Sequence, residues 1–163
     1  FLLDIGPTAD GRIPVIMEER LIQLGEWLDI NGEAIFNSRR WIRDCQWSEG
    51  DIYAYTKQEF HHGIPDPILE MAKTPKKNQA RKECYFTAKD DKLYVLMTML
   101  PDCEMFVIKD LQLDSSSEIR MLGVEGKLEF KNNRKNVEVI LPHLNPSKLP
   151  CKHVYVLEVS NVN

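Results

Sequence analysis

Several common signatures are missing from this chain of 163 residues. It has no Cys-x-x-Cys pair, no Asn-x-Ser/Thr sequon and no glycine-rich loop with the spacing that phosphate binding requires. No apolar run is long enough to cross a bilayer. The formal net charge of −4 supplies no overall positive field for nucleic acid or an anionic membrane. We therefore expect neither nucleic acid nor a membrane among its partners.

The four cysteines stand far apart, at positions 45, 84, 103 and 151. This spacing argues against a structural zinc site, whose ligands usually come in close pairs. Two interpretations stay open. The cysteines form two disulfides in a secreted protein, or they are four reduced thiols in a reducing compartment.

The strongest local pattern predicts a helix over residues 14–30. Pro14 suits the first helical turn, and Glu18 and Glu19 place negative charge near the positive end of the helix dipole. We expect the helix to end at Gly32, in the left-handed conformation that glycine adopts readily. One apolar stripe recurs at helical spacing and is expected to face a core; its members are Met17, Leu21, Leu24 and Leu28.

Short apolar or alternating segments dominate the rest of the chain, with polar connections such as Asn132-Asn133 between them. With 43% hydrophobic residues, the chain has the composition of one folded domain, or of one domain and a piece of another. Strands at this density indicate an antiparallel β-sandwich or barrel and not a further βα unit. The expected strands are 52–55, 84–87, 93–100, 105–108, 119–124, 128–130, 137–141 and 154–159. The proline-punctuated polar stretch 57–82 is expected to be an inserted surface loop.

The first residues pose a separate problem. Phe1, Leu2, Leu3 and Ile5 form a run typical of a strand that is buried on both faces. Such a strand needs hydrogen-bonding neighbours, so we expect further chain upstream. Together with the helix, it makes half of a βα repeat.

Candidate chemical groups are sparse, and each has an ordinary structural explanation. His61 and His62 are adjacent, point in different directions and have no third ligand at a fixed spacing, so we interpret them as loop residues. Glu18, Glu19 and Asp29 are better explained by the helix dipole and by solvation than by acid–base catalysis. The basic cluster is interpreted as a solvated part of the loop; it comprises Lys73, Lys76, Lys77, Arg81 and Lys82.

Aromatic residues occur in three pairs: Trp41 with Trp47, Tyr53 with Tyr55, and Tyr85 with Phe86. Residues two apart on a strand share a face, so Tyr53 and Tyr55 could form a platform for a sugar ring. Core packing is the favoured interpretation of all three pairs. Exposure of these rings distinguishes a carbohydrate-binding module from a supporting sandwich.

The opening stretch FLLDIGPTADGRIP and the following EERLIQLGEWLDINGEAIF resemble the α-L-fucosidases of glycoside hydrolase family 29. Later segments, KLYVLMTMLP, IRMLGVEGKLEF and LPCKHVYVLEVSNV, resemble the C-terminal sandwich of the animal members. Two positions depart from the family pattern, because Asp4 stands where many members have asparagine and Phe36 replaces a tyrosine.

The resemblance implies a mainly β architecture, in which an antiparallel β-sandwich follows the last βα unit of a truncated (β/α)8 barrel. Residues 1–36 would be the terminal strand and helix of the barrel, and residues 37–163 the sandwich with its insertion at about 57–82. It further implies a lysosomal or secreted retaining glycosidase that removes terminal α-L-fucose from glycoconjugates. Such an enzyme would need no metal or organic cofactor, and a homo-oligomer is among the partners that the resemblance implies.

The same resemblance places both catalytic carboxylates on earlier barrel strands or loops, so none is expected in this chain and the piece alone is expected to be inactive. Retention requires two carboxyl groups about 5–5.5 Å apart. Active sites of such barrels lie at the C-terminal ends of the strands. Phe1 is the one candidate for substrate binding, beside the methyl group of the sugar. The alternative function is a non-catalytic carbohydrate-binding or scaffold module.

Overall fold

A computed structural model describes residues 5–52, 78–100, 104–145, 147 and 149–162. Within them, helix α1 (Val15–Asn31) runs directly into a short 3-10 helix, η1 (Gly32–Ala34). The strands that follow are β1 (Arg39–Trp47), β2 (Lys82–Lys89), β3 (Lys92–Met97), β4 (Met105–Ile108), β5 (Glu118–Met121), β6 (Phe130–Asn133), β7 (Asn136–Ile140) and β8 (Tyr155–Ser160). The helix prediction is confirmed to within one residue at each end.

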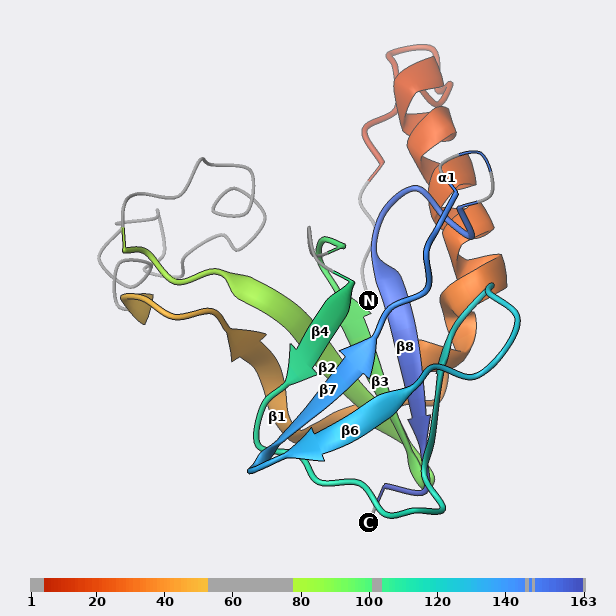
Figure 1. Ribbon diagram of the computed structural model, residues 1–163. Helices are drawn as coiled ribbons and strands as arrows, with labels where there is room; N and C mark the ends of the chain where they lie inside the picture. Colours follow the sequence, from red (N-terminus) through yellow and green to blue (C-terminus); the bar gives the residue numbers. More distant parts are fainter. Residues whose placement is uncertain (1–4, 53–77, 101–103, 146, 148, 163) are drawn as a thin grey trace.

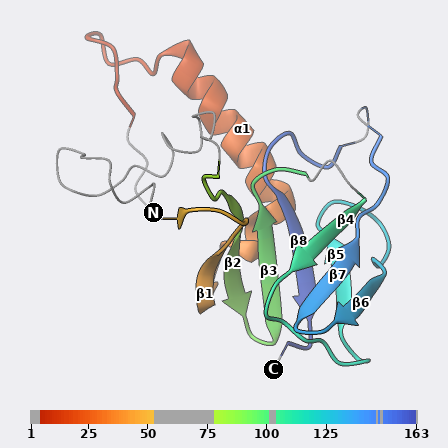
Figure 2. The ribbon, with the colours of Figure 1, turned by 60° about the vertical axis from the view of Figure 1, so that its left-hand side comes forward.

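The strands form two antiparallel sheets, which confirms the predicted fold class. The larger sheet has the order β1-β2-β3-β8-β5 and the smaller one β4-β7-β6. Figures 1 and 2 show the smaller sheet on one face of the larger sheet and α1 on the other. The larger sheet is therefore the middle layer of the molecule.

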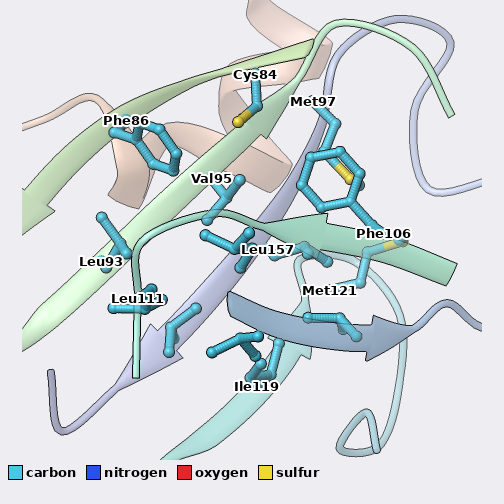
Figure 3. Close-up of a cluster of buried hydrophobic side chains, with 14 of the residues drawn as sticks. Cys84, Phe86, Leu93, Val95, Met97, Phe106, Leu111, Ile119, Met121 and Leu157 are labelled. Carbon is cyan, nitrogen blue, oxygen red and sulfur yellow. The ribbon is translucent and has the colours of Figure 1, made fainter. Parts of the chain in front are cut away.

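Alternation along the strands divides the apolar residues between these two interfaces. In β3, Leu93, Val95 and Met97 belong to the core between the sheets, whereas Tyr94 belongs to a second cluster on the helix side. Figure 3 shows side chains of both sheets meeting in the first core, including Val95, Leu157 and Phe106. Residues of β3 and β8 are buried or half-buried on both faces, so these strands are apolar almost throughout.

Strand β1 is absent from the sequence prediction, although it pairs with β2 along the edge of the larger sheet. Its sequence, RRWIRDCQW, carries four charged residues, and its outward-facing Ile42 is 81% exposed. An edge strand with one solvated face does not need an apolar run, and charge on such an edge discourages pairing with other chains. The signal was a short alternation in which Trp41, Arg43 and Cys45 are half-buried, with exposed residues between them.

Two predictions about the ends of elements are wrong: the left-handed conformation expected at Gly32 and the turn expected at Asn132-Asn133. Gly32 has φ −60°, a right-handed conformation, because α1 continues into η1 instead of stopping. The left-handed residue comes later, at Asn37 with φ 59°. Asn132 and Asn133 are the last residues of β6, and the turn falls on Arg134, with φ 57°.

The predicted loop 57–82 ends earlier than expected. Most of it, together with most of the predicted strand 52–55, lies outside the described residues. Where the description resumes, the Asp51 amide donates to the Asn78 carbonyl at 2.7 Å, and Ala80 is fully buried. Lys82 already belongs to β2. The two ends of the connection between β1 and β2 are therefore joined by backbone hydrogen bonds.

The three described cysteines, Cys45, Cys84 and Cys151, are free thiols. Cys103 lies outside the described residues. Burial raises the pKa of the Cys84 thiol to about 12, and burial likewise raises the pKa values of Cys45 and Cys151. These thiols are protonated at neutral pH and are poor nucleophiles. No helix of the described part is long and apolar enough to span a membrane.

Candidate functional site: the joint between helix and sheet

Most sequence-predicted site residues belong to parts of the chain that the structure does not describe. Phe1, His61, His62, Tyr53 and Tyr55 lie outside the described residues, as do Lys73, Lys76 and Lys77. The carboxylates Glu18, Glu19 and Asp29 are exposed on α1, which agrees with the solvation interpretation. No group of three or more His, Cys, Asp or Glu side chains in the described part is arranged to hold a metal ion.

In the two aromatic pairs that the structure describes, other side chains pack on the rings. Phe86 is buried in the core, and Trp41 packs on it with ring centroids 5.0 Å apart, as core packing predicts. Trp47 and Tyr85 are half-buried, and the ammonium group of Lys82 lies 5.3 Å and 5.1 Å from their ring centroids. Lys82 was therefore wrongly assigned to a solvated loop. These contacts favour a supporting sandwich over a sugar platform at these positions.

A dense set of contacts in the described residues lies where the end of α1 meets the larger sheet; we call it the joint. Its apolar part consists of Ala34, Tyr94, Leu122 and Val156, all buried, with Trp27, Ile30 and Leu96 packed against them. Two hydrogen bonds to backbone carbonyls cross it. The Trp27 indole donates to the Val154 carbonyl at 2.7 Å, and the Thr87 hydroxyl donates to the Ala34 carbonyl at 2.6 Å.

Contact at the joint is close enough to require a glycine. A Cβ at Gly123 would lie 2.8 Å from Cγ2 of Ile30 and 2.7 Å from Cβ of Pro150. Gly123 also has φ +76°, which side chains disfavour. The helix therefore rests on the loop that follows β5 with no space for a methyl group.

We predict that Gly123→Ala lowers the free energy of unfolding by about 2–3 kcal/mol, because it adds both backbone strain and overpacking. Gly126→Ala is the matched control, since Gly126 has φ +95° but nothing within 4 Å of an added Cβ. Urea unfolding of both variants measures the difference. Equal losses in the two variants would contradict close packing at Gly123.

A charged cluster borders the apolar part of the joint. Glu158 on β8 is only 5% exposed. Arg120 on β5 donates to both of its carboxylate oxygens at 2.9 Å, from Nε to Oε1 and from Nη2 to Oε2, and Lys92 on β3 donates to Oε2 at 2.9 Å. Glu33 on η1 accepts from Nη2 of Arg120 at 3.0 Å and from the Tyr94 hydroxyl at 3.4 Å, and it lies 3.9 Å from the Lys92 ammonium.

These contacts shift the ionisation of the cluster. Burial alone would raise the pKa of Glu158, but the hydrogen bonds and positive charges of Arg120 and Lys92 outweigh it and lower that pKa to about 2. The pKa of Tyr94 is raised by burial and by the nearby carboxylates of Glu33 and Glu158. Glu158 is thus ionised and Tyr94 neutral at any physiological pH.

Sequence reasoning missed this cluster, although a signal was present. Glu158 is the only charged residue in YVLEVS, and a lone acidic residue in an apolar strand predicts a buried, paired carboxylate. Its partners could not be identified from the sequence, because Arg120 and Tyr94 become its neighbours only through the register of β5 and β3 with β8.

A shallow groove of about 230 Å³ lies beside the joint, between α1 and the segment before β8. Its lining includes Trp27, Ile30 and Cys151. This volume is below the usual range for small-molecule sites. The described residues around the joint therefore form a packed contact between α1 and the larger sheet.

Comparison with known proteins shows which family this chain resembles. Residues 76–160 match the family model described as alpha-L-fucosidase C-terminal domain, and residues 1–33 match the model described as alpha-L-fucosidase. The tissue alpha-L-fucosidase of Mus musculus is 29% identical over 164 residues, which are 100% of this chain and 29% of that protein. The plasma alpha-L-fucosidase of Rattus norvegicus is 30% identical, over 99% of this chain and 29% of that protein.

Solved structures give the same result. A crystal structure of Thermotoga maritima alpha-fucosidase has a TM-score of 0.65 and 31% identity, and the match covers 97% of this chain and 30% of that one. An alpha-L-fucosidase of family GH29 from Bacteroides thetaiotaomicron shares the fold, with a TM-score of 0.55 at 18% identity. The chain spans less than a third of the length of each of these proteins.

Proposed function

The chain belongs to the alpha-L-fucosidase family, and from this membership we propose that it is the C-terminal part of a longer, retaining α-L-fucosidase that removes terminal α-L-fucose from glycoconjugates. Residues 1–36 would complete a catalytic (β/α)8 barrel, and residues 37–163 would be the sandwich that supports it. The match to only 29% of the mouse tissue enzyme supports this proposal, because most of that protein has no counterpart here.

The observation that carries the proposal is an apolar stripe on α1 that lies outside both buried cores of the described residues. The predicted stripe of Met17, Leu21, Leu24 and Leu28 belongs to neither buried cluster of the described part, since α1 contacts the sheet through Trp27 and Ile30 instead. On this stripe Met17 is 37% exposed, and Leu21, Leu24 and Leu28 are only half-buried. An apolar stripe that stays partly exposed marks a contact surface, and a barrel that α1 completes would cover it.

In the proposed enzyme, catalysis and structural support belong to different parts of the protein. Upstream residues would supply the nucleophile and the acid/base, about 5–5.5 Å apart for a retaining reaction. This chain would hold the last helix of the barrel in place, with no metal or organic cofactor. Phe1 would lie against the methyl group of the sugar, where an aromatic ring suits an apolar substituent.

Partners and location follow from the same proposal. The substrate would be a fucosylated glycan bound by the upstream barrel. We further propose that the full-length enzyme forms a homo-oligomer. The relatives include proteins named as tissue and as plasma alpha-L-fucosidases, which supports a lysosomal or secreted location.

The test is hydrolysis of a chromogenic α-L-fucoside by the protein encoded by the complete coding sequence, beside the 163-residue chain. We expect turnover by the longer protein and none by the chain alone, because the catalytic carboxylates lie upstream. A longer protein that folds but does not hydrolyse the fucoside would overturn the proposal and favour a carbohydrate-binding or scaffold module.

A further inference from the structure

The segment that ends α1 is fixed by contacts within itself and by contacts with the sheet. Asn31 is fully buried and donates from its amide to the Trp27 carbonyl at 3.1 Å. A Cβ at Gly32 would lie 2.9 Å from Cε2 of Phe36. Ala34 is fully buried in the joint and accepts from Thr87. Glu33, between them, is the residue of η1 that reaches the charged cluster.

We propose that Glu33, Lys92, Arg120 and Glu158 form a latch that fixes the end of α1 on the larger sheet. The two glutamates have different roles in it. Glu158 is a fixed anchor on a central strand, and its carboxylate holds both cations at 2.9 Å. Glu33 is the residue that attaches the helix, because its contacts with Arg120, Lys92 and Tyr94 all go to strands of the sheet.

The geometry explains why four charges are needed where one ion pair would not suffice. An isolated exposed pair contributes little, because water competes for both partners and two long side chains must be ordered. Here the Arg120 guanidinium is already ordered by a two-pronged contact with a buried carboxylate, so Glu33 meets a preformed site. Glu158 in turn needs both cations, since an unpaired buried carboxylate is strongly destabilising.

In the proposed enzyme the latch would set the angle between barrel and sandwich, because α1 contacts both. This consequence rests on the proposed function. The latch itself requires only the described residues, so it can be tested on the 163-residue chain and can fail while the fucosidase proposal stands.

Hydrogen exchange of backbone amides, read by peptide mass spectrometry at pH 7, is the direct test. Glu33→Gln keeps the anchor and removes the charge that attaches the helix. We expect exchange in residues 25–36 to become about threefold to tenfold faster, as for loss of a charged hydrogen bond that is partly exposed. Exchange in β4 and β7 is expected to stay the same, because their core does not include the joint.

Two further variants complete the design. Glu158→Gln removes the anchor and is expected to increase exchange in residues 25–36 by more than Glu33→Gln does. Glu138→Gln is the matched control, since Glu138 lies on β7 of the other sheet and pairs with Lys131 at 3.0 Å. It is expected to leave residues 25–36 unchanged.

The latch is overturned if Glu33→Gln leaves exchange in residues 25–36 at the wild-type rate. It is also overturned if exchange rises equally in those residues and in β4 and β7, because the cluster would then contribute only to global stability. Since Glu33 is at the surface, its variant is expected to fold even if Glu158→Gln does not.

Discussion

Replacing Leu157 by alanine is expected to lower the free energy of unfolding by about 3–4 kcal/mol, the usual loss for a fully buried leucine. Leu157 is 0% exposed on β8, a central strand of the middle layer, and it pairs with Val95 on one side and Met121 on the other. Figure 3 shows it among the side chains of both sheets. A cavity there removes contacts from both sheets at once.

Ile140→Ala is the control for this prediction, since Ile140 lies on β7 but is 50% exposed. We expect a loss of about 0.5 kcal/mol, as for surface substitutions. Chemical unfolding followed by far-UV circular dichroism measures both variants. Similar losses in the two would contradict the placement of the core between the sheets.

The second prediction is that the folded state loses stability at low pH as Glu158 becomes protonated. The pKa of Glu158 is lowered in the folded state to about 2, whereas the unfolded chain has an ordinary glutamate. A lowered pKa stabilises the folded state at all pH values above the unfolded pKa, and this stabilisation disappears as the pH falls to the folded value. The stabilisation should therefore be complete at pH 6, smaller by pH 3.5 and nearly absent at pH 2. Its size is about 3 kcal/mol.

Thermal unfolding of the wild type and of Glu158→Gln across this pH range measures the effect. The difference in melting temperature between them should be largest at pH 6 and should shrink toward pH 2, since glutamine does not titrate. A difference that is constant with pH would show that the loss comes from packing and not from the charge of Glu158.

The sequence predicts the periodic parts of this molecule well and its contacts poorly. The helix and most strands follow from spacing, because a buried face imposes a period on the residues that occupy it. Strand β1 was not predicted, because an edge strand needs only one apolar face and so lacks an apolar run. The apolar stripe of α1 was recognised, but the face that packs on the sheet is a different one, formed by Trp27 and Ile30.

At the candidate site, too, the sequence indicates that a residue needs partners but not which residues they are. That Glu158 must be paired can be inferred from its apolar neighbours along β8. That its partners are Arg120 and Lys92 depends on the pairing of strands far apart in the sequence, and that Glu33 joins them depends on how α1 lies across the sheet. Resemblance to a family supplied the fold and the proposed reaction, and the joint came from the structure.

The central claim is that α1 has two partners, the larger sheet on one face and an upstream barrel on the other. Methionine oxidation by hydroxyl radicals, compared between the 163-residue chain and the protein from the complete coding sequence, tests it most directly. Met17 lies on the apolar stripe of α1 outside both cores and is 37% exposed, and Met105 on β4 is a matched reporter at 40%. We predict that Met17 becomes protected in the longer protein while Met105 reacts as before; equal oxidation of Met17 in both proteins would contradict the account.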